Sequence, residues 1–339
     1  MKRTLSILPA AGLFFFTYTL LPGQENFSWR LSGESGIYQD KVLQRNDLFL
    51  RLDGQARFKY RLDNFTASIQ TRAIPSFYNS KPDIRSLKLI VYGLVEYTKP
   101  SYDISLEGNN RTYHFQNSVD DIRGDLRLIQ VSLNKLFNRS IVLGGVAGAG
   151  EENIATNNHY TRELWFTELR TVFHLLKSLK MNSGFYYEDF LLHRDEMYIF
   201  KTLSNRGQRF GPLLQLSLLT NIWIRLEYRY LIHNSDLVTS NSFENNFRFF
   251  IGKTIERHLT FLLLADYNAR RFNVAQKVIP DINLIYSPLE MENRIYLKTV
   301  FSVNEKWDLY LRLGYGQESF QQRYFIIEGW QTVAGISIK

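Results

Sequence analysis

Residues 48–63 alternate without a break between two kinds of side chain. One phase is apolar and the other is mostly charged: Leu48, Leu50, Leu52, Gly54, Ala56, Phe58, Tyr60 and Leu62 against Phe49, Arg51, Asp53, Gln55, Arg57, Lys59, Arg61 and Asp63. Because successive side chains of a strand point to opposite faces, this pattern predicts one long strand with an apolar and a charged face. Such a strand is typical of a tilted membrane-spanning strand between lipid and water.

The first 23 residues have the layout of a secretory signal peptide. Lys2 and Arg3 precede an apolar stretch over residues 5–21, and Pro22, Gly23 and two polar residues follow it. We therefore predict a signal peptide over residues 1–23 and a mature chain over residues 24–339, with an uncleaved membrane anchor as the alternative. No later run approaches the about 18 apolar residues of a spanning helix, so a membrane-embedded mature chain would cross with strands.

Composition narrows the function classes. The chain has no Cys, which excludes a lipid-anchored lipoprotein, disulfides and thiol chemistry. Its net charge of +8 includes Lys2 and Arg3, and the basic residues alternate along strands instead of clustering, so we do not expect nucleic-acid binding. The six His are scattered without paired ligand spacing, so we expect neither a metal site nor a cofactor.

The mature chain repeats one unit: an alternating strand, a short polar turn, another alternating strand and a more variable polar connection. We place the short turns at residues 62–64, 99–101, 138–140, 177–180, 220–221, 256–258 and 304–306. With a first strand over residues 26–38 and a last over residues 323–339, the pattern predicts an all-β, antiparallel, up-and-down barrel of about 16 strands, or about 14 as the alternative.

Three segments are less regular. Residues 163–176 fit a strand or an amphipathic helix, and we assign a strand because the neighbouring segments are strands. Residues 193–208 and 272–291 are the connections long enough to fold inward and narrow a lumen. Gly144, Gly145 and Gly148 lie in a strand pattern, which favours a bend or a close strand approach over a phosphate loop.

The alternating strands, the short turns and the aromatic residues at the ends of the apolar phase resemble bacterial outer-membrane β-barrel proteins, and more loosely porins. Those aromatic residues are Phe58, Tyr60, Tyr97, Tyr230, Trp307 and Trp330. The last residue, Lys339, departs from the resemblance because such barrels usually end in an aromatic residue. The resemblance implies a cleaved signal, an outer-membrane location and a water-filled channel, monomeric or trimeric, for small hydrophilic solutes.

The inward phase of this barrel is rich in Arg and Lys, interleaved with acids. The predicted pore-lining residues are Arg51, Arg57, Lys59, Arg72, Arg225, Glu227, Arg229, Arg248, Arg270 and Arg312. Basic rings set anion selectivity in pores, so we predict passive diffusion with a weak anion preference. The alternative for each residue is that it only pairs with charges on neighbouring strands in a solvated wall.

Two rival functions stay open. A barrel-embedded lipid hydrolase would use His233, Asn234, Ser235 and Asp236, which faintly resemble the His-x-Ser-Asn-Gly motif of outer-membrane phospholipase A. Asp236 and Leu237 replace the Asn and Gly of that motif, so we interpret the segment as a polar outer loop and expect no enzyme. The other rival is a non-conducting envelope protein, adhesin or secretion-associated barrel whose outer loops bind a partner.

The predicted partners follow from the resemblance. They are outer-membrane lipid, the barrel-assembly machinery and periplasmic chaperones during biogenesis, small hydrophilic solutes and, in a homo-oligomer, further copies of the same chain.

Overall fold

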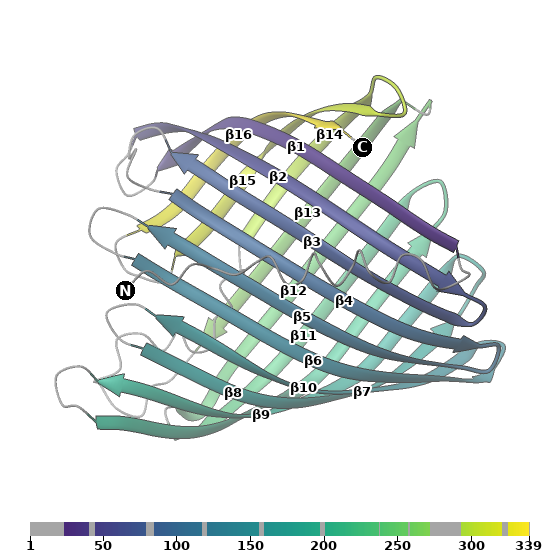
Figure 1. The fold of residues 1–339 in the computed structure, drawn as a ribbon, viewed down its shortest axis with the longest axis vertical. Helices are drawn as coiled ribbons and strands as arrows, with labels where there is room; N and C mark the ends of the chain where they lie inside the picture. The colour runs from purple at the N-terminus through teal and green to yellow at the C-terminus, as the bar shows by residue number, and fades with distance from the viewer. Residues whose placement is uncertain are drawn as a thin grey trace.

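The protein is an antiparallel barrel of sixteen strands (Figure 1). The computed structural model describes residues 24–40, 45–78, 85–116, 121–155, 159–196, 201–236, 238–256, 258–271, 293–320 and 325–338. The strands are β1 (Gln24–Asp40), β2 (Arg45–Leu62), β3 (Phe65–Tyr78), β4 (Arg85–Lys99), β5 (Tyr102–Gln116), β6 (Asp121–Asn138), β7 (Ile141–Ala155), β8 (His159–His174), β9 (Leu179–Glu196), β10 (Lys201–Leu219), β11 (Trp223–Ser235), β12 (Val238–Ile255), β13 (Leu259–Arg271), β14 (Asn293–Ser302), β15 (Trp307–Phe320) and β16 (Phe325–Ile338).

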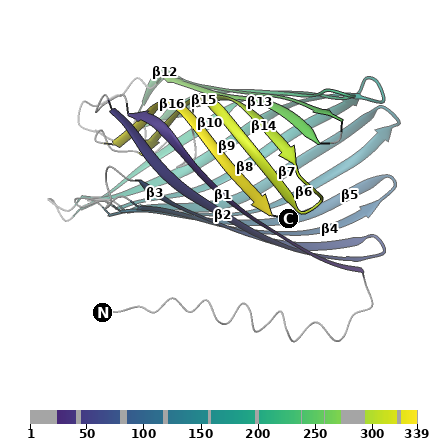
Figure 2. The ribbon, with the colours of Figure 1, turned by 90° about the horizontal axis from the view of Figure 1, so that it is seen from above.

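Each strand pairs with its neighbours in sequence, and β1 closes the barrel by pairing with β16 from Leu31 opposite Ile338 to Tyr38 opposite Gln331. Closure pairs the backbone donors and acceptors of β1 and β16 along residues 31–38, while residues 24–30 of β1 pair with β2 alone. Figure 2 shows the strands inclined around a common axis. The described residues contain no helix long and apolar enough to cross a membrane.

Short turns gather at one end of the barrel, which we call the short-turn end (Figure 1). Seven turns of two to four residues join β2 to β3, β4 to β5, β6 to β7, β8 to β9, β10 to β11, β12 to β13 and β14 to β15. Asp63 has a φ of 48°, which Asp tolerates and a two-residue hairpin turn requires. Asn304 Oδ1 accepts hydrogen bonds from the backbone N–H of Lys306 and Trp307 at 2.8 and 2.9 Å, a local turn motif.

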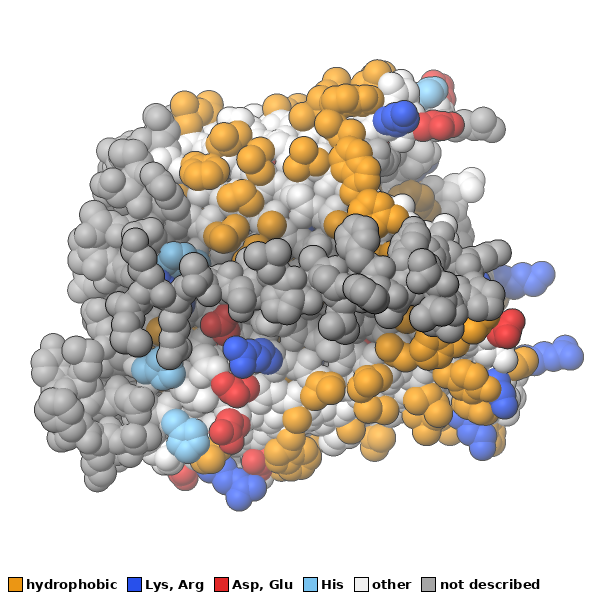
Figure 3. Space-filling model, in the orientation of Figure 1, with side chains coloured by type: hydrophobic (Ala, Val, Ile, Leu, Met, Phe, Trp, Pro, Cys, Tyr) orange, Lys and Arg blue, Asp and Glu red, His pale blue; other side chains and the backbone are white. Residues whose placement is uncertain are grey.

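The outer face of the strands is largely apolar (Figure 3). Leu50 and Leu52 are 47 and 40% exposed there, whereas Phe49, on the opposite phase of the same strand, is 6% exposed. Tyr97 and Trp307 are exposed on this face near strand ends, and Trp330 is exposed on it in the middle part of β16. An exposed apolar belt with aromatic residues near its edges is what a lipid-facing surface requires.

The prediction of an all-β barrel with about 16 strands is confirmed, and the alternative of about 14 strands is wrong. Residues 159–174 form a strand, as predicted for most of residues 163–176. The interpretation of residues 193–208 as an inward-folding connection is wrong, because most of the segment belongs to β9 and β10, and these strands pair in register from Leu179 opposite Leu218 to Glu196 opposite Lys201. The predicted signal peptide and the connection 272–291 lie outside the described residues.

Candidate functional site: the charged inner wall

The strand register places the ten predicted pore-lining residues on one face, the inner face of the barrel. Arg51 shares its phase with Glu34 on β1 and Ser76 on β3, which lie opposite it in register. When the register is followed from each strand to the next around the barrel, Arg229, Arg248 and Arg312 fall on the same face as Arg51. Arg270 has its backbone on this phase, but its side chain is outside the described part of the chain.

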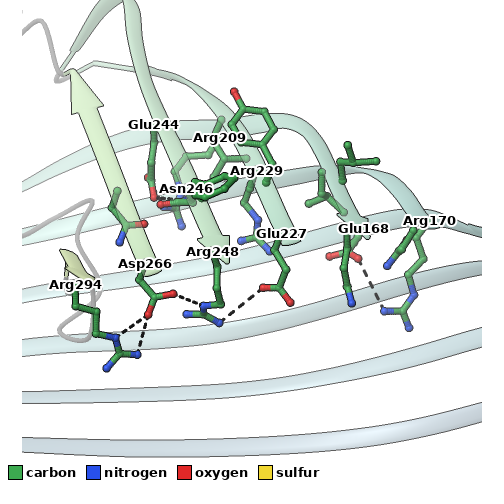
Figure 4. Close-up of a pocket in the computed structure, with 18 of the residues that line it drawn as sticks. Glu168, Arg170, Arg209, Glu227, Arg229, Glu244, Asn246, Arg248, Asp266 and Arg294 are labelled. Carbon is green, nitrogen blue, oxygen red and sulfur yellow. Dashed lines mark hydrogen bonds and ion pairs between the residues drawn. The ribbon is translucent and has the colours of Figure 1, made fainter. Parts of the chain in front are cut away.

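Four residues on β11 to β14 form a row of alternating charges, which we call the paired ladder: Glu227, Arg248, Asp266 and Arg294 (Figure 4). Arg248 Nε donates to Asp266 Oδ1 at 2.6 Å, and Arg294 Nε donates to Asp266 Oδ2 at 2.8 Å. Arg248 Nη1 lies 3.8 Å from Glu227 Oε2, and Glu227 also pairs with Arg225. Each carboxylate of the ladder therefore serves two guanidinium groups.

The paired ladder lines a cavity of about 540 Å³ inside the barrel (Figure 4). Arg111 on β5 and Glu168 and Arg170 on β8 line the same cavity, so it is bounded by strands well separated around the wall. Arg229, another of its lining residues, lies with its guanidinium carbon 5.0 Å from the centre of the Tyr186 ring, a cation–π contact. The lining can therefore offer both anion- and cation-binding groups to a polar solute.

A second set of charged residues is buried, which we call the buried cluster: Glu152, Arg162, Glu188, Arg209 and Glu244. Arg209 donates two hydrogen bonds to Glu188, at 2.8 and 2.5 Å, and its Nη1 lies 3.7 Å from Glu244. Arg162 Nη2 lies 2.8 Å from Glu152. Glu188 is only 1% exposed, so these pairs are shielded from the solvent that weakens surface ion pairs.

Apolar side chains lie beside the buried cluster on the same face. Ile154, Tyr160, Leu164, Phe190 and Leu192 form one buried group. Glycines make room for the rings: a Cβ on Gly207 would collide with the Phe190 ring, and a Cβ on Gly148 would meet the Phe166 ring at 2.5 Å. The Arg162 guanidinium lies over Phe190, 5.9 Å from the ring centre. The Phe166 and Phe190 rings thus lie against glycine residues of the neighbouring strands.

Glu34 on β1 contacts β2 on one side and, across β16, reaches β15 on the other side of the inner face. It lies 3.3 Å from Arg51 on β2 and 3.2 Å from Arg312 on β15, and Tyr310 donates its hydroxyl to the same carboxylate at 3.0 Å. Lys298 lies above the Tyr310 ring, with its Nζ 3.6 Å from the ring centre. Charged and aromatic groups therefore support the seam where the barrel closes.

The remaining predicted pore-lining residues of β2 and β3 differ in whether they form ion pairs. Arg72 donates two hydrogen bonds to Asp53, at 2.9 and 2.6 Å, in a bidentate ion pair. Arg57 and Lys59 form no ion pair with any described residue. The inner face therefore mixes paired and unpaired charges, which the sequence pattern alone did not separate.

Sequence reasoning did not identify the buried cluster. None of its five residues was among the predicted site residues, and Arg209 follows the segment that was interpreted as a connection. The alternation from Arg209 through Leu213 to Gln215 and Ser217 was the available signal, and it continues the inner phase of β10. The cluster brings together residues from five different strands, which no local pattern reveals.

The segment proposed for lipid hydrolysis is not the predicted outer loop. Residues 233–235 belong to β11, with a register irregularity against β12 between His233 and Ser235. His233 is 1% exposed and lies 3.4 Å from Glu244, and its register partner Ser242 is fully buried. Ser235 is only half-buried, but His233, which would have to act as its base, is closed to solvent, so the geometry does not support this site. No group of three or more His, Asp or Glu among the described residues could hold a metal ion.

Comparisons with known proteins bear on the fold. No protein-family model matches the sequence, and no curated protein is significantly similar to it. Among solved structures, CdiB from Acinetobacter baumannii superimposes with a TM-score of 0.53 and 12% identity over 92% of this chain and 60% of that chain. The chain therefore spans less than two thirds of the length of CdiB.

Two further similar structures are the TodX monoaromatic hydrocarbon channel deltaS2 mutant and the alcaligin outer membrane receptor FauA from Bordetella pertussis. TodX matches with a TM-score of 0.41 and 10% identity over 95% of this chain and 91% of that chain. FauA matches with a TM-score of 0.42 and 9% identity over 94% and 76%. The closed sixteen-stranded barrel has the fold of an outer-membrane β-barrel, and at 12% identity the likeness to CdiB shows the fold alone.

Proposed function

We propose that this protein is an outer-membrane channel through which small hydrophilic solutes diffuse passively, with a weak preference for anions. The observation that carries the proposal is the charged inner wall around the 540 Å³ cavity, set against an apolar outer face. Barrels of about 16 strands are wide enough to enclose an aqueous lumen, whereas barrels of about eight are filled by side chains.

The sign of the selectivity follows from the charges of the inner face. Along β14, β15, β16, β1, β2 and β3 the described basic residues outnumber the acidic ones; they are Arg294, Lys298, Arg312, Arg30, Arg51, Arg57, Lys59, Arg61 and Arg72 against Asp308, Glu34 and Asp53. The strands β4 to β13 carry both signs in near balance on this face. Because fixed positive charge lowers the free energy of anions in a pore, chloride should pass slightly more readily than potassium.

The test is the single-channel conductance of the refolded mature chain in a planar bilayer, with the reversal potential measured under a KCl gradient. We expect stable conductance steps and a reversal potential of the sign that indicates chloride preference. Cation preference would contradict the proposed selectivity. The absence of any conductance from a barrel that is folded, as judged by a heat-dependent shift in its electrophoretic mobility, would overturn the channel function.

A second candidate function is a barrel that does not conduct at rest and acts through a bound partner. The buried cluster favours it, because Glu188 and Glu244 are only 1 and 2% exposed although both belong to the inner face. In that case the same bilayer recording would show silent membranes from well-folded protein. The proposed placement, in outer-membrane lipid after delivery by periplasmic chaperones and the barrel-assembly machinery, is common to both candidates.

A further inference from the structure

Three basic residues follow one another on the inner face of β2 at its short-turn end. We call them the basic stripe: Arg57, Lys59 and Arg61. Arg57 and Arg61 are exposed and Lys59 is half-buried. Alternate residues of a strand are about 6.6 to 7 Å apart, so the three charges span roughly 14 Å of wall.

The strands on either side of the stripe contribute only uncharged polar groups. On β1, Ser28 lies opposite Arg57 and Asn26 opposite Lys59. On β3, the opposite residues are Gln70, Ser68 and Thr66. Hydroxyl and amide groups can donate hydrogen bonds to an anion but cannot neutralise a cation. The stripe is therefore a set of positive charges among neutral donors.

The acids around the stripe are bound by other partners or lie two strands away: Glu96 on β4 is opposite Thr66, which is itself opposite Arg61. Asp53, on the same strand, accepts two hydrogen bonds from Arg72. Glu107 accepts hydrogen bonds from Tyr92 and Gln130, each at 3.0 Å. Within the described part of the chain, no member of the stripe forms an ion pair.

Neighbouring charges of this kind repel one another unless an anion binds between them. Their spacing is shorter than the roughly 8 Å Debye length of physiological salt, so the mutual repulsion is only partly screened. A guanidinium group binds phosphate oxygens with two parallel hydrogen bonds, and an ammonium group adds a compact positive charge. An anion with several charged oxygens can contact two stripe residues at once, whereas chloride contacts one.

We propose that the basic stripe is a binding site for multivalent oxyanions, such as short polyphosphates, at the short-turn mouth of the lumen. Its role in transport rests on the proposed channel function: the stripe would concentrate such solutes at this mouth and slow their passage. Short turns face the periplasm in outer-membrane barrels, so the site would lie on the periplasmic side.

The experiment measures the block of KCl current by tripolyphosphate, added in turn to each side of a bilayer that contains the mature protein. We expect block from one side, and about a tenfold higher half-blocking concentration in the variant R57Q/K59Q/R61Q. The charge-conserving variant R57K/R61K should keep most of the block. An unchanged half-blocking concentration in the triple Gln variant would overturn the proposal.

A matched control separates the stripe from the overall charge of this end of the barrel. R139Q/K177Q/K306Q removes the same three charges from exposed residues of short turns, outside the inner face. We expect its half-blocking concentration to stay within about twofold of the unmodified protein, because exposed turn charges are screened by salt. An equal loss of block in both triple variants would show that net charge decides, and would contradict the stripe as a site.

A binding measurement distinguishes failure of the stripe from failure of the channel. Tripolyphosphate is titrated calorimetrically into the detergent-solubilised, folded barrel and into R57Q/K59Q/R61Q. Binding that the triple variant loses supports the site even if the protein does not conduct. Conductance without tripolyphosphate block or binding would overturn the site and leave the channel function standing.

Discussion

The basic stripe on β2 and the paired ladder on β11 to β14 use the same side chains in opposite ways. In the ladder, Asp266 binds both Arg248 and Arg294, so the guanidinium groups are held and largely neutralised. In the stripe, Arg57 and Lys59 lie among Ser, Asn, Gln and Thr side chains. The ladder therefore makes its part of the wall polar without much net field, whereas the stripe supplies net positive potential.

The comparison extends to the buried cluster, where pairing is combined with burial. Arg209 and Glu188 are joined by two hydrogen bonds and are almost closed to solvent. Buried pairs are costly to break because the remaining charge has no replacement partner, and exposed charges are cheap to remove. We expect stability to depend on the buried cluster and selectivity to depend on the stripe and the ladder.

The largest expected effect is on stability. Arg209→Ala removes both hydrogen bonds to Glu188 and leaves that buried carboxylate with weaker partners, so the free energy of unfolding should fall by about 3 to 5 kcal/mol. The measurement is urea-induced unfolding of the refolded barrel in lipid vesicles. Lys59→Ala is the matched control and should change stability by less than about 0.5 kcal/mol. Similar losses in the two variants would break the distinction between buried and exposed charge.

The next prediction tests whether the absence of a side chain at Gly207 makes room for the apolar ring packed beside the buried cluster. A Cβ on Gly207 would collide with the Phe190 ring, so Gly207→Ala should lower the free energy of unfolding by about 1 to 3 kcal/mol. Gly108→Ala, where a Cβ meets no atom within 4 Å, should leave stability unchanged or raise it by about 0.5 kcal/mol. The measurement is the urea midpoint of unfolding of the two variants. An unchanged midpoint in Gly207→Ala would argue against close packing of the Phe190 ring at Gly207.

Removing a carboxylate from the paired ladder should increase the preference of the pore for anions. Asp266→Asn removes the carboxylate that Arg248 and Arg294 share, so the permeability of chloride relative to potassium should rise by about twofold. The measurement is the reversal potential under a KCl gradient. Asp63→Asn makes the same charge change at an exposed short turn and should leave the reversal potential unaltered. An unaltered potential in Asp266→Asn as well would show that the ladder does not face the ion path.

The smallest effect concerns the partly exposed pair Arg72 and Asp53. A double-mutant cycle with Arg72→Ala and Asp53→Ala should give a coupling free energy of about 0.2 to 1 kcal/mol, as for other solvated ion pairs. Unfolding free energies of the two single variants and the double variant supply the cycle. A coupling energy above about 2 kcal/mol would place this pair with the buried cluster instead.

Much of the fold was predictable because the information for a barrel strand is local. The alternation through residues 48–63 identified β2 and its inner face, and the short polar turns identified the hairpins. The same alternation assigned Arg225, Glu227 and Arg229 to one phase, and the register agrees. The prediction went wrong at residues 193–208, where polar residues such as Arg194, Asp195 and Glu196 suggested a loop but the hairpin strands continue.

The sequence by itself determined which side chains share a face, because the two-residue period of a strand depends only on local backbone geometry. It therefore determined that an apolar surface and a charged surface would run along each strand. Only the tertiary structure decided which charges meet. Tyr310 and Arg312 reach Glu34 because closure brings β15 within reach of β1, although the residues lie 276 and 278 positions apart in the chain. Whether an Arg is paired, as in the ladder, or unpaired, as in the stripe, depends on strand register, and register is set by the closed sheet as a whole.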